Sequence, residues 1–128
     1  MHTIHRLSLL LSPLLIAACA ATAPPATEFP VGARTPSAAE LTTLLRGKTA
    51  STPLPNGGTV RVDFAADSNQ VTAYVGGRSD TGTWRAEDGR ACYDWKVFNS
   101  GCGEMRLVGQ SLYVKRSNGD VVPVTIAR

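Results

Sequence analysis

From Thr59 onward, apolar and polar residues alternate with a period of two, and this pattern constrains the fold more than any other feature. In "TVRVDF", for example, Val60, Val62 and Phe64 fall on one face, as is typical of a half-buried β-strand. Similar runs follow in "VTAYV", "TGTWRA", "RACYDWKVF", "GEMRLV", "SLYVK" and "VVPVTI", separated by turns rich in Gly, Asn and Asp. We therefore predict a mainly β fold of about seven strands, an antiparallel meander curled into a small barrel or a compact sandwich. Pro123 suggests that the last strand lies at an edge, because proline cannot donate a ladder hydrogen bond.

One short helix is predicted ahead of these strands, in "TPSAAELTTLLRGK". Ser37 and Glu40 have the spacing of a capping box, and Gly47 suits the position after the last turn. The helix also carries a stripe of three leucines, Leu41, Leu44 and Leu45. A helix this short is marginal alone, so we expect the leucine stripe to pack against the sheet.

Residues 1–18 have the features of a secretory signal peptide. "MHTIHR" is a short, weakly basic start, and "LSLLLSPLLIAA" is an apolar stretch of 12 residues. A membrane-spanning helix needs about 20 apolar residues. This stretch is shorter and ends in small residues, as signal-peptide cleavage sites do. We predict that residues 1–18 are removed.

The end of this stretch, Ile16-Ala17-Ala18-Cys19, resembles the lipobox of bacterial lipoprotein precursors. The resemblance implies cleavage before Cys19 and attachment of palmitate-like acyl chains, which hold a protein at a membrane. Ala20 follows the cysteine, and in bacterial lipoproteins this points to the outer rather than the inner membrane. The expected location is the cell envelope, at the outer membrane and facing the periplasm.

The mature chain is expected to consist of a tether and one domain. Residues 19–36 are rich in Pro, Ala and Thr and show no apolar period, so we assign them to a lipidated tether and residues 37–128 to a single β domain. Without Arg6 the mature chain has 12 basic and 10 acidic side chains, a net charge of +2. This charge is too small for a nucleic-acid-binding protein.

The strand-rich part is similar to a set of small proteobacterial periplasmic β domains of uncharacterised function. They share a "G-x-W … C-x-x-W … C" core, which here is formed by 82–84, 92–95 and Cys102. The resemblance covers about residues 40–128 and implies a fold, without an activity to transfer.

Cys92 and Cys102 remain as an even pair once Cys19 is acylated. They lie on neighbouring predicted strands in an oxidising compartment, so we expect a disulfide. A redox or metal-binding pair is the alternative. The spacing is not C-x-x-C, and both histidines, His2 and His5, lie in the signal peptide. We predict no metal site and no cofactor.

The absence of histidine from the mature chain also argues against an enzyme, because it removes Ser-His and Cys-His nucleophile activation. A pair of carboxylates could still act as general acid and base. Asp94 is the acid of most interest, because it lies between two aromatic residues on the same side of its strand as Lys96. We expect an Asp94–Lys96 charge pair rather than a catalytic acid, and no catalytic residues.

Aromatic residues and arginines are interleaved along the strands, as at protein interfaces. We expect Trp84 to belong to the core, whereas the pattern leaves core and interface roles equally open for Tyr93 and Trp95. The candidate binding surface consists of Arg78, Tyr93, Trp95, Phe98 and Arg106.

These features predict a lipid-anchored binding module of the cell envelope. Its expected partner is an envelope protein, such as a secreted or periplasmic enzyme that it inhibits or against which it gives immunity. Loops 76–82 and 98–103 would insert into the partner's cleft. The alternative is a structural envelope lipoprotein that contacts the cell wall or an assembly.

Overall fold

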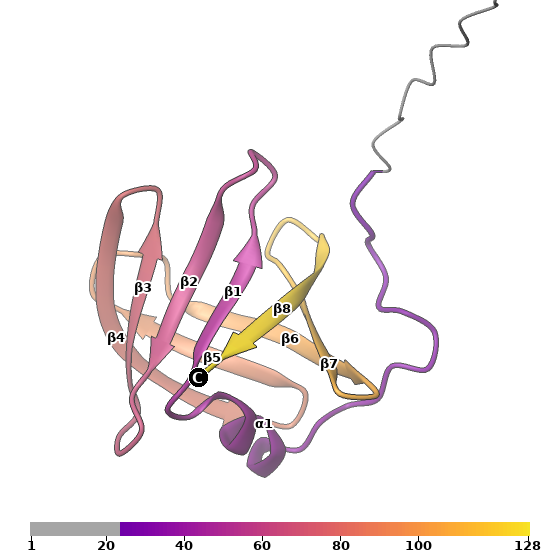
Figure 1. Ribbon diagram of the computed structural model, residues 1–128, viewed down its shortest axis with the longest axis horizontal. Coiled ribbons are helices and arrows are strands. Elements are labelled where there is room, and N and C mark those ends of the chain that lie inside the picture. The colour runs from indigo at the N-terminus through magenta and orange to yellow at the C-terminus, as the bar shows by residue number, and fades with distance from the viewer. Residues whose placement is uncertain (1–23) are drawn as a thin grey trace, which may run out of the picture.

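Each strand of the chain pairs with the next one, and β8 returns to pair with β1, so that the sheet closes on itself (Figure 1). The computed structural model describes residues 24–128; the predicted signal peptide and the lipobox with Cys19 lie outside the described residues. One helix, α1 (Ala38–Leu45), precedes the strands β1 (Thr49–Pro53), β2 (Thr59–Phe64), β3 (Gln70–Val75), β4 (Arg78–Glu87), β5 (Arg90–Trp95), β6 (Gly101–Val108), β7 (Ser111–Lys115) and β8 (Val121–Ala127). The predicted antiparallel meander is confirmed, and its form is a barrel rather than a sandwich.

The barrel has one strand more than the sequence pattern suggests, and the additional strand is β1. Its sequence "TASTP" lacks apolar alternation, and Ala50 is its one buried residue. β1 pairs with β2 on one side, from Thr49↔Asp63 to Pro53↔Thr59, and with β8 on the other. Its position therefore depends on partners from both ends of the sheet.

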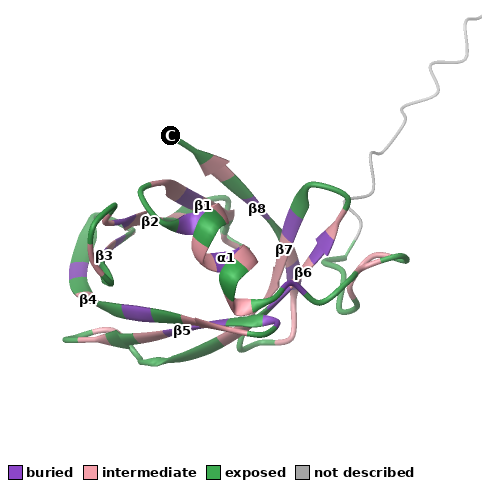
Figure 2. Cartoon of the chain, turned by 90° about the horizontal axis from the view of Figure 1, so that it is seen from below, coloured by how far each residue is buried: buried purple, intermediate pink, exposed green. Residues whose placement is uncertain are grey.

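Helix α1 closes one end of the barrel, as the view from below shows (Figure 2). The predicted capping box is present: Ser37 Oγ accepts a hydrogen bond from the Glu40 N–H at 3.1 Å, and Glu40 Oε1 accepts one from the Ser37 N–H at 3.3 Å. Gly47 follows the helix with a φ of +73°, which favours glycine. Leu41 and Leu45 are fully buried against the barrel, so the predicted packing face is confirmed.

The hydrophobic core lies inside the barrel, at the end that α1 closes. Trp84 on β4 is 3% exposed and meets Phe64 edge-on, with ring centroids 4.8 Å apart. The predicted core role of Trp84 is therefore confirmed. Met105 and Leu107 on β6 complete this part of the core.

The segment before α1 lies along the outside of the barrel, where it is bridged to β8 and to β6 (Figure 1). The Val121 N–H donates to the carbonyl oxygen of Ala26 at 2.7 Å. Further along, Arg34 and Leu107 exchange two backbone hydrogen bonds, at 2.8 and 3.0 Å. We call residues 26–36 the N-terminal strap. Because the strap is held on the barrel, it does not add to the reach of the predicted tether.

Pro123 lies at a partial edge of the closed sheet. β8 pairs with β1 only from Thr125 to Ala127, whereas Pro123 pairs with Tyr113 of β7. At Pro123 the strand therefore has a neighbour on one side, which is compatible with proline's missing donor.

Cys92 on β5 and Cys102 on β6 are directly opposite one another and form a disulfide, as predicted. The bond joins the two strands next to the loop at 96–100.

Within residues 24–128, no helix has the length and apolar character needed to cross a membrane.

Candidate functional site

Between α1 and the opposite, open end of the barrel, the interior forms a cavity of about 860 Å³. Leu45 of α1 lies at its floor. Apart from Phe64, the residues of β1, β2 and β3 that line the cavity are small: Ala50, Thr52, Val60, Val62, Ala73 and Val75. An eight-stranded barrel has room either for its own side chains or for one small ligand. Because small residues line one half of this barrel, the space remains available to a ligand.

The far end of the cavity opens between four loops, at 54–58, 76–77, 96–100 and 116–120. We call this opening the mouth. The residues lining the cavity from these loops or beside them are Leu54, Arg78, Val97, Phe98, Asn99, Arg116 and Ser117.

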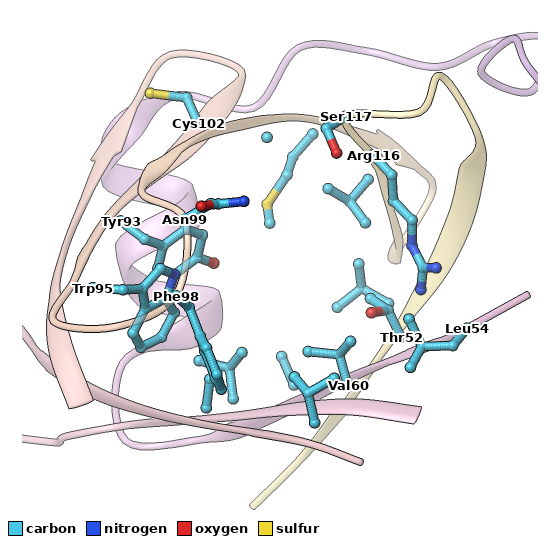
Figure 3. Close-up of a pocket in the computed structure, with 18 of the residues that line it drawn as sticks. Thr52, Leu54, Val60, Tyr93, Trp95, Phe98, Asn99, Cys102, Arg116 and Ser117 are labelled. Atoms are coloured by element: carbon cyan, nitrogen blue, oxygen red, sulfur yellow. The ribbon is translucent and has the colours of Figure 1, made fainter. Parts of the chain in front are cut away.

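One wall of the cavity is aromatic. Tyr93 and Trp95 on β5 stack with their rings 5.4 Å apart and 9° from parallel, and the Phe98 ring lies 6.3 Å from Trp95 (Figure 3). β5 ends at Trp95, so strict strand alternation no longer applies and Phe98 reaches the same side as Trp95. Strict strand alternation would place Phe98 on the opposite face from Tyr93 and Trp95, so parity alone gives the wrong side for Phe98.

The Tyr93 hydroxyl is the main polar group on this wall, and it points into the cavity (Figure 3). Burial raises the pKa of the Tyr93 phenol well above its usual value, and no hydrogen bond to another described residue offsets this effect. The phenol therefore stays protonated and offers a hydrogen-bond donor to a ligand.

Asp80 fixes the loop that carries Phe98. Its side chain is buried, and its Oδ2 accepts hydrogen bonds from the backbone N–H groups of Val97 at 2.7 Å and Phe98 at 2.9 Å. Burial opposes ionisation of Asp80, but the hydrogen bonds from Phe98, Val97 and Thr81 outweigh it and hold the pKa of Asp80 below its usual value. Asp80 falls in the predicted loop 76–82, whereas the structure places it in β4, and nothing in the local pattern indicated its role.

Two guanidinium groups lie at the mouth. Arg78 lies over the Phe98 ring, with its Cζ 5.3 Å from the ring centroid. Arg116 lies opposite the aromatic wall, and its guanidinium turns toward Thr52 and Leu54 (Figure 3). Its Nη2 atom is buried and has no hydrogen-bond partner among the described residues. Burial lowers the pKa of Arg116, although Asp120 acts in the opposite direction.

Residues 13–121 match the family described as "Protein of unknown function (DUF995)". The chain belongs to this family. The matched range contains every residue that lines the cavity except Val124, so the cavity lies in the part of the chain shared with the DUF995 family. No curated protein and no solved structure matches the chain.

In this DUF995 member, four of the five residues of the predicted binding surface lie together: Arg78, Tyr93, Trp95 and Phe98 all line the cavity. Arg106 lies elsewhere, on the outer face of the barrel. Its Nη1 donates to the carbonyl oxygens of Gly89 at 3.0 Å and Met105 at 2.8 Å, and its Cζ lies 5.2 Å from the centroid of the Phe29 ring. Arg106 therefore joins the strap to a turn and does not contribute to the cavity.

Arg116 lines the cavity but was not part of the predicted binding surface. It follows Leu112 and Val114 with the same two-residue spacing, and all three face inward. Extending the strand pattern into the turn "RSNGD" would have placed its side chain inside the barrel.

Asp94 has an exposed side chain, and within residues 24–128 it forms no ion pair with Lys96, contrary to expectation.

Carboxylate and sulfur atoms of Glu87, Cys92 and Cys102 lie within 4.8 Å of one another, as metal ligands do. Both sulfurs belong to the disulfide, however, so they offer no thiolate to a metal.

Proposed function

We propose that this protein is a lipid-anchored binding module of the bacterial cell envelope, and that it holds an apolar small molecule inside its barrel. The observation that carries the proposal is the cavity of about 860 Å³. Small-molecule sites span roughly 300–1,000 Å³ and are mostly apolar, with a few polar groups that orient the ligand. Here the polar groups at the mouth and along the aromatic wall are Thr52, Arg78, Tyr93, Asn99, Arg116 and Ser117.

The walls of the cavity are held before a ligand arrives. Ladder hydrogen bonds close the barrel, a disulfide joins β5 to β6, and Asp80 holds the loop that carries Phe98. A preorganised site loses less conformational entropy on binding. Apolar surface that enters it gains about 25 cal/mol per Å² removed from water.

The route of the N-terminal strap supports a location close to a membrane. Ala26 is held beside Val121, next to the loop at 116–120, so the strap begins at the mouth. Cys19 precedes Ala26 by seven positions, which span at most about 25 Å. An acyl chain on Cys19 would therefore keep the mouth near the membrane surface, where apolar molecules partition.

A neutral fluorescent dye tests the proposal. N-phenyl-1-naphthylamine is titrated into a soluble form of the chain that begins at residue 20, and its emission is followed. Ala73 faces the cavity and Thr72 faces outward on the same strand. We expect saturable binding, lost in Ala73→Phe and kept in the matched control Thr72→Phe, with circular dichroism showing that both variants fold. Absence of saturable dye binding, or equal binding by the two variants, overturns the proposal.

A protein partner is the second candidate, and exposed Val97 favours it. This side chain is 70% exposed and lies beside the mouth, in the loop at 96–100, next to the segment 98–103 that was predicted to enter a partner's cleft. Capture of an envelope enzyme by the wild type and not by Val97→Asp would support the inhibitor or immunity hypothesis. Recovery of the protein with cell-wall material after detergent treatment would instead support the structural alternative.

A further inference from the structure

We propose that the ligand of the barrel is a single-chain amphiphile with an anionic head group. Its tail would lie in the cavity and its head group would bind Arg116 and Arg78 at the mouth. This inference rests on the proposed function and adds the chemical class of the ligand.

Arg116 carries the argument for an anion. Its Nη2 atom is buried without a hydrogen-bond partner in the described part of the chain, although its side chain as a whole is half-buried. A buried donor that lacks a partner costs free energy, and a carboxylate or phosphate oxygen would satisfy it with a charge-assisted bond. The guanidinium turns toward Thr52 and Leu54, where the mouth meets the apolar interior (Figure 3).

Arg78 supplies a second positive charge at the mouth. It packs on the Phe98 ring and forms no ion pair with any carboxylate among residues 24–128. Stacking on an aromatic ring leaves the N–H groups at the edge of the guanidinium plane available to a ligand. Asn99 and Ser117 lie beside these arginines and add neutral hydrogen-bonding groups.

The carboxylates near the mouth accept hydrogen bonds from neighbouring groups, and the charge of Asp120 also acts on Arg116. No Asp or Glu is among the residues that line the cavity. The Asp80 carboxylate accepts from backbone N–H groups, and Asp120 Oδ2 accepts from the Asn118 amide at 3.0 Å. A cationic head group would therefore find no free carboxylate in the cavity lining, whereas an anionic one finds two arginines.

Below the arginines the lining is apolar down to the helix. Aromatic rings form one wall, aliphatic side chains of β1 to β3 form the other, and Leu45 and Met105 lie toward the floor. Such a lining suits a hydrocarbon tail, because removing apolar surface from water is favourable. The volume is in the range of one small ligand, so we assign one chain to it.

The test compares head groups on one tail. Laurate, dodecanol and dodecylamine displace the neutral dye from the wild type, from Arg116→Gln and Arg78→Gln, and from the control Arg85→Gln, which lies outside the cavity. A hydrogen bond to a charged group is worth about 1.5–3 kcal/mol, so we expect laurate to bind roughly 10- to 100-fold more tightly than dodecanol. Arg116→Gln should remove most of this preference, while dodecanol binding stays the same and Arg85→Gln behaves as the wild type. A lysophosphatidate with the same tail distinguishes a phosphate head from a carboxylate head.

Equal affinity for laurate and dodecanol in the wild type would overturn this inference, and so would tighter binding of dodecylamine. Because that comparison needs no variant, it holds even where Arg116→Gln fails to fold. Saturable binding of the neutral dye in the same experiment would leave the proposed function standing. Absence of binding by the dye and by all amphiphiles would overturn both.

Discussion

Phe98 is held at the mouth of the barrel by Asp80, a residue 18 positions earlier in the chain. The Asp80 carboxylate accepts a hydrogen bond from the Phe98 N–H at 2.9 Å, and Arg78, two residues from Asp80, covers the Phe98 ring. The start of β4 thus fixes both the position of the loop at 96–100 and the charge beside it.

Replacing Asp80 with alanine should release this loop. The N–H groups of Val97 and Phe98 would lose their acceptor, so their hydrogen exchange should become much faster than in the wild type. Dye binding should weaken several-fold, because Phe98 no longer completes the aromatic wall. The control is Asp94→Ala, which removes an exposed carboxylate from β5 and should leave both measurements unchanged. Unaltered exchange at Val97 and Phe98 in Asp80→Ala would contradict the role of Asp80.

Stability should fall as the pH falls below about 4. Arg61 donates two hydrogen bonds to Asp63 and lowers the pKa of that carboxyl. A carboxyl whose pKa is lower in the folded state stabilises the fold above its unfolded value of about 3.9, and this contribution is lost as pH falls through the folded pKa. Urea unfolding between pH 2 and 7 measures it. Asp63→Asn should show a shallower acid limb than the wild type, and parallel curves would disprove this explanation.

Much of the fold follows from local pattern. Turn residues and two-residue periodicity located seven strands, the capping box located α1, and cysteine counting predicted the disulfide. β1 was missed because "TASTP" has no apolar alternation, and its pairing with β8 depends on closure of the whole barrel. The strap was assigned to a tether because its contacts are backbone hydrogen bonds to distant strands, which leave no period in the sequence.

The candidate site was located in part, because composition finds aromatic residues and arginines but not their partners. Tyr93 and Trp95 share a face by strand parity, and Phe98 joins them only because the strand ends at Trp95. Arg106 was selected for the same reason as Arg78, because it is an arginine among the aromatic residues of the strands. Its long-range contacts with Gly89 and Phe29 nevertheless hold it on the outer face. The cavity itself depends on the summed volume of residues from every strand.

Removing the disulfide should destabilise the barrel without opening it. Cys92 and Cys102 are separated by 10 positions, and closing a loop of this length stabilises a protein by about 3 kcal/mol in the chain-entropy model. Cys92→Ala/Cys102→Ala should lose about this much free energy of unfolding in urea. Reduced wild type should behave similarly, and unchanged stability in both would show that the cross-link contributes nothing.

Replacing Phe29 with alanine should loosen the N-terminal strap. Its ring lies below both Arg106, at 5.2 Å, and Lys115, at 5.9 Å. Such cation–π contacts are worth about 0.5–1 kcal/mol each at exposed sites. Trypsin should therefore cut after Arg34 faster in Phe29→Ala than in the wild type. Val31→Ala is the control because that side chain is fully exposed. Equal cleavage rates in all three proteins would show that Phe29 does not hold the strap.

Tryptophan quenching by a brominated fatty acid tests the central claim most directly. The chain has two tryptophans, and Trp95 lines the cavity whereas Trp84 lies in the core. A bromine on the tail should quench Trp95 saturably in the wild type and in Trp84→Phe, and quenching should largely disappear in Trp95→Phe. Arg116→Gln should need roughly 10-fold or more fatty acid to reach the same quenching. If no saturable quenching is seen in the wild type, or if Trp95→Phe is quenched as strongly as Trp84→Phe, the barrel does not hold the tail where the structure indicates.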